Sequence, residues 1–198
     1  PAAGLGGLGA RPDDGGGDLP LARQLLAEAG YPGGAGFPPV EYAFNAVSKL
    51  HEHIPVELQA TFREALGVRI ELRPLEWKTY LNNMSKLDYD MMRSSWIGDY
   101  NDPNTFLDLF LSNGGNNRTG WRDPEFDQLI HTANATLDRT RRFELLGQAE
   151  ARLLHVGAPI VPLYSYVGFY ALDTNRITGV HGNLLDEHPF WAIGRLPR

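Results

Sequence analysis

The chain has 198 residues, a length that suits one domain or one lobe of a larger protein. Hydrophobic residues make up 42% of it and charged residues 21%, so we expect a packed core rather than wholesale disorder. A formal net charge of −6 argues against a nucleic-acid-binding protein, which needs a basic face. The lack of cysteine excludes disulfides and thiol catalysis, and no apolar run approaches the roughly 18 residues of a membrane span.

The N-terminal segment, residues 1–18, is rich in glycine and proline, and we expect it to be flexible. Residues 4–9 satisfy G-x-G-x-x-G, but no strand precedes them and Pro12 stops any helix after them. A dinucleotide site, which needs a strand, a turn and a helix, is therefore not expected. Because the chain begins at Pro1 without an initiator Met, we interpret it as cut or processed from a longer protein, with any export signal upstream.

Regular elements are predicted from residue 19 onward. Asp18 can cap a helix that starts near Pro20 and ends at Gly30. The hydrophobic pattern then predicts a strand at 40–47, a helix at 54–66 stopped by Gly67, a strand at 68–73, a helix at 75–85 and a strand at 89–95. Strands that alternate with helices in this way indicate an α/β lobe.

The second half of the chain is predicted to be mostly helical. The pattern gives a helix at 104–111, an exposed loop at 112–120, a helix opened by Asp123-Pro124, a second helix at 143–156 and a strand at 160–166. Residues 168–198 have no helical period, and their short apolar pieces need another surface to lie on.

Candidate metal-ligating and catalytic side chains are few. His51 and His53 lie at a helix start, where residues i and i+2 point apart, so we expect no metal site there. No nucleophile elbow, zinc-protease helix or P-loop motif occurs. Asp99 and Asp102 are close enough in sequence to suggest the carboxylate pair of a hydrolase, but Asp102 before Pro103 is also typical of a helix cap.

The segment 89–103 is the most informative part of the chain. It runs from a predicted strand directly into a turn, which places Trp96 to Asp99 at the carboxyl end of that strand. Open α/β sheets bind ligands outside such ends. An aromatic ring, a small residue and a carboxylate there suit an aliphatic or peptide ligand that carries a cation. The pattern alone equally allows Trp96 to be a core residue and Asp99 a turn residue.

Short motifs follow one another through residues 19–170. The central one is a strand followed by Trp96-x-x-Asp99-Tyr100-x-x-Pro103 and a helix with Phe106-Leu107-x-x-Phe110. The others are Leu25 to Tyr31, Gly67-Val68 leading to Glu76-Trp77-x-x-Tyr80, Asp123 to Asp127, and Ala158 to Tyr164. In this order they resemble the extracytoplasmic oligopeptide- and dipeptide-binding proteins of ABC importers, solute-binding protein family 5.

The resemblance implies an α/β fold, namely one lobe of a bilobal periplasmic-binding-protein-like fold of class II with a mixed sheet flanked by helices. The chain resembles only the C-terminal lobe. Residues 1–18 would be the flexible segment, residues 19–167 the ligand-binding lobe, and residues 168–198 a tail that returns to the missing N-terminal lobe. The hinge is expected around Val167-Gly168.

The resemblance also implies a function without catalysis. The protein would capture oligopeptides or dipeptides and deliver them to the membrane permease of an ABC importer, with no cofactor and no metal. It would work in the periplasm or, lipid-anchored, on the outer face of the cytoplasmic membrane.

Site residues follow from the same resemblance. Asp99 would receive the ammonium of the peptide N-terminus, and the strand at 93–96 would pair with the peptide backbone. Trp96 and Ile97 would lie at the pocket near that terminus, and Tyr166 at the ligand wall. The last two candidates, Arg93 and His51, match positions that can meet the peptide carboxylate; a surface salt bridge and a helix-start histidine remain open as their alternatives.

Three alternative functions remain open at this stage. A member of the same family could carry nickel, haem or a sugar, in which case Asp99 would not face an ammonium. A hydrolase could use Asp99 and Asp102. The ligand-sensing half of a regulator would be distinguished by a helix-turn-helix upstream in place of a signal peptide.

Overall fold

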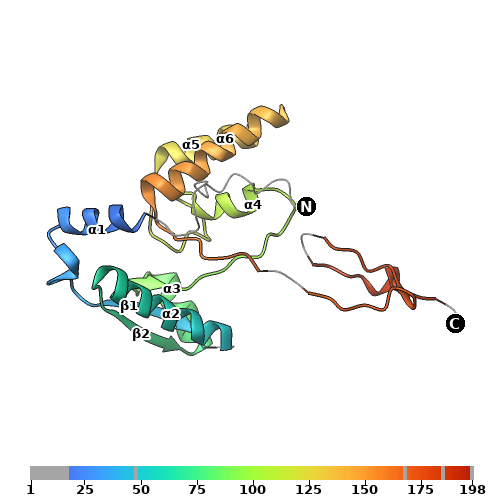
Figure 1. Ribbon diagram of the computed structural model, residues 1–198. Coiled ribbons are helices and arrows are strands. Elements are labelled where there is room, and N and C mark those ends of the chain that lie inside the picture. The colour runs from blue at the N-terminus through green and yellow to red at the C-terminus, as the bar shows by residue number, and fades with distance from the viewer. Residues whose placement is uncertain (1–17, 47–48, 167–168, 184–185, 197–198) are drawn as a thin grey trace. The chain divides into compact units, whose positions relative to one another are not determined.

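The computed structural model describes residues 18–46, 49–166, 169–183 and 186–196 (Figure 1). These residues form two compact units. The first, which we call the sheet unit, contains the described residues up to Ser95 together with Arg118–Gly120. The second, the helix unit, contains Trp96–Asn117 and the described residues from Trp121 onward.

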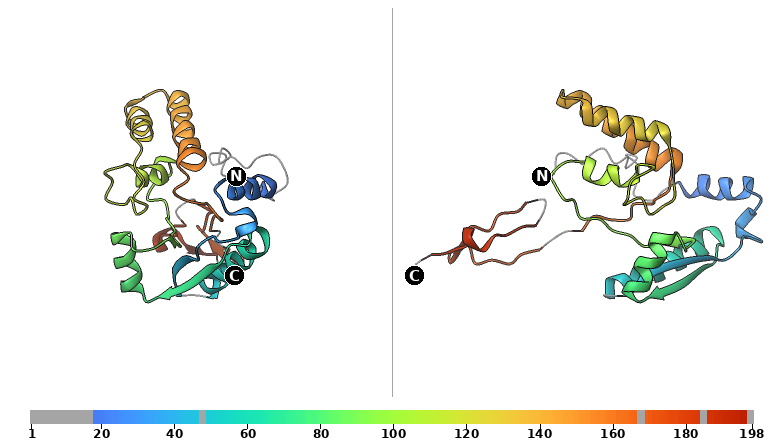
Figure 2. Two further views of the ribbon diagram at one scale, coloured as in Figure 1. Left: turned by 90° about the vertical axis from the view of Figure 1, so that its left-hand side faces the viewer. Right: turned by 180° about the vertical axis from the view of Figure 1, so that it is seen from behind.

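The sheet unit is built on three parallel strands in the order β2-β1-β3: β1 (Val40–Asn45), β2 (Ile70–Leu75) and β3 (Met91–Met92). Helix α2 (Lys49–Leu66) connects β1 to β2, and α3 (Trp77–Lys86) connects β2 to β3. Because the two crossovers run in opposite directions across the sheet and such crossovers are right-handed, the helices cover opposite faces, as Figure 2 shows. The predicted α/β class is confirmed, but the sheet of this unit is parallel and not mixed as expected.

The core of the sheet unit lies on the α2 side of the sheet. Its buried members come from β1, β2 and the turn before β2: Tyr42, Phe44, Val68 and Ile70. Residues of α2 and Leu26 of α1 (Leu19–Glu28) pack against them. Asp18 caps α1 as predicted, accepting a hydrogen bond from the Leu21 N–H at 2.9 Å.

Gly67 ends α2 as predicted, and the structure shows why a glycine is needed there. Its φ of +70° lies in the left-handed region, where a side chain is strained. A Cβ at this position would also collide with the backbone of Gly33 in the 3₁₀ turn Pro32–Gly34. The turn and the end of α2 can therefore approach each other only with glycine at residue 67.

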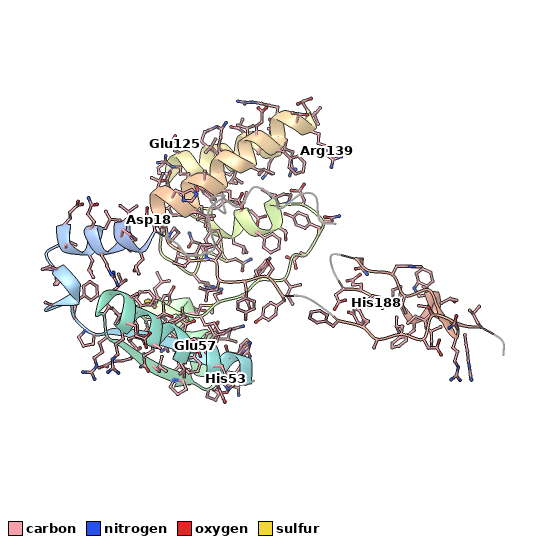
Figure 3. The ribbon with its side chains drawn as sticks, viewed as in Figure 1. Asp18, His53, Glu57, Glu125, Arg139 and His188 are labelled. Carbon is pink, nitrogen blue, oxygen red and sulfur yellow. The ribbon has the colours of Figure 1, made fainter. Side chains whose placement is uncertain are left out.

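The helix unit contains α4 (Asn104–Leu107), a 3₁₀ turn (Asp108–Phe110), α5 (Pro124–Ala135), α6 (Arg139–Ala151) and a π-helical turn (Arg152–Gly157). Helices α5 and α6 lie side by side, with Glu125 at one end of the pair and Arg139 at the other (Figure 3). Their shared core consists of Leu107, Phe126, Ile130, Ala133, Leu145, Leu146, Ala149 and Leu153. Among the described helices, none has both the length and the hydropathy to cross a membrane.

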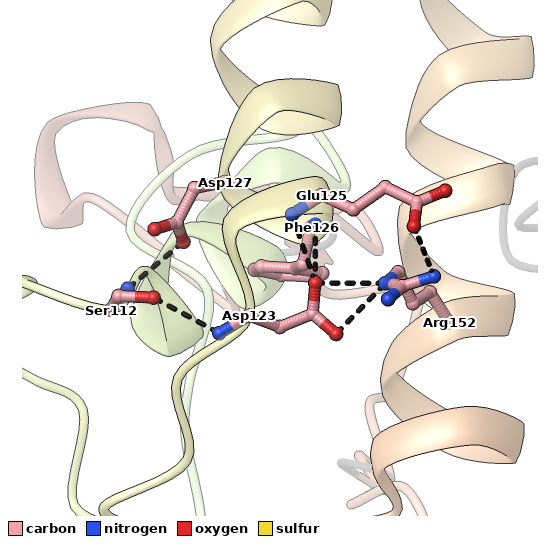
Figure 4. Close-up of polar contacts among 6 residues, drawn as sticks. All are labelled: Ser112, Asp123, Glu125, Phe126, Asp127 and Arg152. Carbon is pink, nitrogen blue, oxygen red and sulfur yellow. Dashed lines mark hydrogen bonds and ion pairs between the residues drawn. The ribbon is translucent and has the colours of Figure 1, made fainter.

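Asp123 ties the start of α5 to the end of α6 (Figure 4). One carboxylate oxygen accepts hydrogen bonds from the Glu125 and Phe126 N–H groups at 3.0 and 2.9 Å, which makes Asp123 the predicted cap of α5. The Nε of Arg152 donates to both carboxylate oxygens at 2.8 Å. The Asp123 N–H in turn donates to Ser112 Oγ at 3.1 Å. Asp123 thus joins the start of α5 to Arg152 through its carboxylate and to Ser112 through its backbone amide.

Replacing Asp123 with Ala is expected to lower the free energy of unfolding by about 1–2 kcal/mol, because two amides at the start of α5 lose their acceptor. Asp123→Asn keeps a capping oxygen and loses only the ion pair, so it should cost less. Urea unfolding of the purified chain, followed by circular dichroism, measures both. Equal stability of the wild type and the Ala variant would contradict this role.

The same pair predicts a pH dependence. Hydrogen bonding from Arg152 holds the pKa of Asp123 below its usual range, although burial opposes this. A carboxyl with a lowered folded pKa stabilises fully above its unfolded value of about 4, and the stabilisation is lost as the pH falls through the folded value. The difference between the wild type and Asp123→Asn should therefore shrink on acidification.

The C-terminal tail contains a two-stranded antiparallel sheet, β4 (Ile177–Thr178) with β5 (Gly194–Arg195), and a 3₁₀ turn at Phe190–Ala192. Three of its aromatic side chains are almost fully exposed: Phe169 at 90%, Phe190 at 91% and Trp191 at 88%. That these side chains pack on another lobe stays a prediction.

Some predicted elements differ from the structure. The strand at 160–166 is wrong: the segment is extended without ladder bonds, because Pro159 and Pro162 lack amide donors and no strand in the described chain pairs with it. The strand at 89–95 is shortened to β3, the helix at 104–111 changes to a 3₁₀ turn after Leu107, and α2 begins at Lys49 rather than near 54. The predicted flexible segment (except Asp18), its glycine motif and the hinge at Val167-Gly168 lie outside the described residues.

Candidate functional site

The candidate site begins with the loop that opens the helix unit. Asp99 is exposed there, and its carboxylate makes no hydrogen bond or ion pair with any residue the structure describes. Trp96 is 39% exposed and Ile97 75% exposed, so neither is a core residue. The alternative in which Trp96 belongs to the core is therefore wrong. An acidic group and two apolar side chains lie within four residues on one accessible segment.

The backbone of this loop is held firmly while the Asp99 side chain is left available. The Asp99 N–H donates to Thr105 Oγ1 at 3.0 Å, and Thr105 is only 2% exposed. Gly98 lies so close to α4 that an added Cβ would be 3.1 Å from the Thr105 methyl. On the other side, Asn104 Nδ2 donates to the Tyr100 hydroxyl at 3.2 Å. The carboxylate is thus presented from a pre-organised backbone.

A second carboxylate makes the surroundings of Asp99 more negative. Asp108 is half-buried, and its Oδ2 accepts a hydrogen bond from the Tyr100 hydroxyl at 3.4 Å. Burial raises the pKa of Asp108, the Tyr100 hydrogen bond opposes the rise, and the charge of Asp99 adds to it. A cation beside Asp99 would therefore also reduce the repulsion at Asp108.

Asp102 does not form a catalytic pair with Asp99. Arg142 of α6 grips it with two hydrogen bonds, at 2.6 and 2.9 Å, and Asp102 Oδ1 also accepts from the Asn104 N–H at 2.9 Å. The bond from Arg142 is the main reason that the pKa of Asp102 is lowered. A carboxylate so occupied is a poor proton donor or base. The helix-cap alternative is the correct one for Asp102.

Arg93 and His51 come together in the sheet unit. Arg93 Nη2 lies 2.8 Å from His51 Nε2, and Arg93 Nη1 donates to Oδ1 of the buried Asn45 at 3.3 Å. Burial, and next the charge of Arg93, lower the pKa of His51, while a backbone hydrogen bond with Asn45 opposes this. The imidazole is therefore neutral and accepts from the guanidinium. Arg93 is a half-buried cation at the carboxyl ends of β1 and β3, where its guanidinium contacts His51 and Asn45.

The outer edge of the sheet at β3 is open among the described residues. The Arg93 N–H donates to the Ala43 carbonyl at 2.9 Å, which extends the β3 pairing by one residue. The Arg93 carbonyl accepts from the Tyr80 hydroxyl at 2.7 Å. In the order β2-β1-β3, β3 is an edge strand, and the exposed Ser94 follows it. This is the edge to which an extended ligand can add a strand.

The remaining predicted residue, Tyr166, is 52% exposed in the helix unit and packs edge-on against Tyr164 with ring centroids 5.1 Å apart. Trp96, Ile97 and Asp99 thus share one loop, Arg93 and His51 form a second cluster, and Tyr166 lies on a third segment. No three His, Cys, Asp or Glu side chains gather as a metal site among the described residues. The sequence reasoning missed Arg142, because its link to this loop is an ion pair with Asp102, 40 residues away in sequence.

Comparison with known proteins identifies the family. Residues 5–118 match the family described as bacterial extracellular solute-binding proteins, family 5 Middle. The oligopeptide-binding protein OppA of Bacillus subtilis (strain 168) is 36% identical over 151 residues, which cover 76% of this chain and 27% of the relative. The chain therefore spans about a quarter of the length of that relative.

Solved structures show the same likeness. The periplasmic oligopeptide-binding protein OppAIV of Borrelia burgdorferi matches with a TM-score of 0.79 and 30% identity, over 90% of this chain and 36% of that one. OppA of Haemophilus influenzae in complex with RPPGFSPFR matches with a TM-score of 0.76 and 26% identity, over 90% of this chain and 35% of that one. The predicted periplasmic-binding-protein-like fold is confirmed. With more than half of its length matched, the chain belongs to family 5 of the bacterial extracellular solute-binding proteins.

Proposed function

We propose that this chain is the ligand-binding C-terminal part of an extracytoplasmic protein that captures oligopeptides or dipeptides for an ABC importer. The observation that carries the proposal is the exposed Asp99 carboxylate, unpaired among the described residues and held on a fixed backbone. Family membership supports it, since relatives are named for oligopeptide binding and one is solved with a nine-residue peptide. Binding, without chemistry, is the whole activity in this proposal.

The Asp99 carboxylate receives the ammonium of the peptide N-terminus. A charge-assisted hydrogen bond of this kind contributes about 1.5–3 kcal/mol. The strand at 93–96 pairs with the peptide backbone at the open edge beside β3, and main-chain hydrogen bonds read no side chain. Together the two contacts fix the register of a peptide without selecting its sequence.

The other predicted residues act on other parts of the ligand. Arg93, supported by His51, meets the carboxylate of peptides that reach it, since a half-buried guanidinium suits bidentate carboxylate recognition. Trp96 and Ile97 border the pocket for the first side chain, and Tyr166 contributes to the ligand wall; all three are exposed. Apolar walls with few fixed polar contacts allow varied side chains.

Ligand capture requires a second lobe. Residues 19–167 form the ligand-binding lobe, and the tail at 168–198 returns to an N-terminal lobe. Closure of the two lobes buries the peptide, and the closed protein presents it to the membrane permease. The protein works in the periplasm or, lipid-anchored, on the outer face of the cytoplasmic membrane.

Isothermal titration calorimetry of the complete protein with a mixed tripeptide pool tests the proposal. We expect micromolar or tighter binding of peptides with free amino termini, and none of nickel, haem or sugars. Binding of one of those ligands without peptide binding would contradict the proposal. The chain by itself should bind peptides weakly or not at all, and micromolar binding by it alone would mean that the second lobe is dispensable.

A further inference from the structure

We infer that Arg142 is a positioning residue for the Asp99 carboxylate and that it acts through its ion pair with Asp102. The inference rests on the proposed function, because the position of Asp99 matters only if Asp99 receives the ligand's ammonium. All of the residues involved belong to the helix unit. Among the described residues Arg142 pairs with Asp102 and not with Asp99, and its effect passes through α4.

The first link is the fork between Arg142 and Asp102, which are 40 residues apart in sequence. Two hydrogen bonds, at 2.6 and 2.9 Å, join the guanidinium to the two carboxylate oxygens. The side chains are only 21% and 24% exposed, so water and salt compete little with the pair. A bidentate pair of this kind fixes direction as well as distance.

The second link runs from Asp102 to the first turn of α4. Asp102 Oδ1 accepts from the Asn104 N–H at 2.9 Å, and the Asp102 carbonyl accepts from the Thr105 N–H at 3.2 Å. Helix α4 has only four residues, too few to be stable without a cap and packing. The carboxylate that caps this turn is the same one that Arg142 holds.

The third link runs from α4 back to Asp99. Thr105 Oγ1 accepts from the Asp99 N–H at 3.0 Å, and Asn104 Nδ2 donates to the Tyr100 hydroxyl at 3.2 Å. Both contacts arise from the turn that Asp102 caps. At the other end of α4, Leu107 is 5% exposed and belongs to the helix core. Loss of Arg142 should therefore loosen the start of α4 and the Asp99 loop while the core stays packed.

The test measures how well the complete protein distinguishes a free from an acetylated N-terminus. Its readout is the ratio of the dissociation constants of one tripeptide in its acetylated and free forms. In Arg142→Met we expect this ratio to fall about five- to tenfold, with the acetylated peptide affected less than about twofold. Arg142→Lys keeps one charged hydrogen bond without the fork and should be intermediate.

Two neighbouring variants make the test specific. Arg141 lies next to Arg142 on α6, but it is exposed and pairs with Glu144 one turn away at 3.0 Å, so Arg141→Met should leave the ratio unchanged. Asp102→Asn keeps an oxygen for the cap and loses the ion pair, and it should lower the ratio as Arg142→Met does. If Arg142→Met does not fold, Asp102→Asn tests the same ion pair.

Asp99→Asn provides the reference, because it removes the charge itself. If it does not lower the ratio, the proposed function fails and the inference fails with it. If Asp99→Asn lowers the ratio but Arg142→Met or Asp102→Asn leaves it at the wild-type value, the positioning role alone is overturned. An equal fall in Arg141→Met would also overturn it, since the effect would then come from the net charge of α6.

Discussion

Asp99→Asn in the complete protein is expected to weaken the binding of free-amine peptides about 10- to 100-fold, because it replaces a charge-assisted hydrogen bond by a neutral one in a closed site. The substitution keeps the size of the side chain, and the backbone contact of Asp99 with Thr105 does not depend on its charge. Acetylated peptides, which carry no ammonium, should already bind poorly and should lose little more. Isothermal titration calorimetry gives the dissociation constants of the free and the acetylated peptide for the wild type and for Asp99→Asn.

Asp138→Asn is a matched control for this prediction. It removes the same charge from an exposed position of the helix unit, and Asn remains a good cap for α6. It should leave both peptide affinities unchanged. Equal loss in Asp99→Asn and Asp138→Asn would mean that net charge, and not contact, attracts the ligand. Equal affinity of the wild type for free and acetylated peptides would remove the assigned role of Asp99.

Phe126→Ala is expected to cost about 3–5 kcal/mol in the free energy of unfolding, the range for a phenylalanine removed from a closed core. Phe126 is fully buried between α5 and α6, and its ring packs edge-on against Trp121 with centroids 5.1 Å apart. The substitution would leave a cavity in this core, to which Leu107 of α4 also belongs. Urea unfolding of the purified chain, followed by circular dichroism, measures the loss.

Leu137→Ala is the matched control for the core prediction. Leu137 lies in the connection between the same two helices but is fully exposed, so its truncation should change stability by less than about 0.5 kcal/mol. A loss below about 1 kcal/mol in Phe126→Ala would mean that the helix pair does not depend on this core. A comparable loss in Leu137→Ala would mean that another surface covers Leu137.

Elements with local signals were predictable from the sequence. Helix α5 starts at Pro124 after the Asp123 cap, and α2 ends at Gly67, because caps and glycine stops act within a few residues. The position of Trp96, Ile97 and Asp99 after a strand indicated a loop at its carboxyl end, but the pattern alone left open whether Trp96 is buried, and the structure shows it exposed. The contact of Arg93 with His51 could be anticipated only through the family resemblance, since the two lie 42 residues apart.

Features that depend on distant partners could not be predicted. Residues 160–166 are mostly apolar and aromatic, as is typical of a strand, but a strand needs a neighbour, and the described chain offers none. The apolar face that predicted α2 was counted from Ile54, and the helix begins five residues earlier, at Lys49. The ion pair between Arg142 and Asp102 joins residues that are 40 positions apart in sequence, and no local pattern predicts such a contact.

The most direct test of the central claim is a crystal structure of the complete protein with a bound tripeptide. We expect a carboxylate oxygen of Asp99 to lie about 2.7–2.9 Å from the nitrogen of the peptide's free N-terminus. The peptide backbone should pair with the chain at 93–96. A bound peptide whose ammonium is held by another group, with Asp99 turned to solvent, would contradict the account.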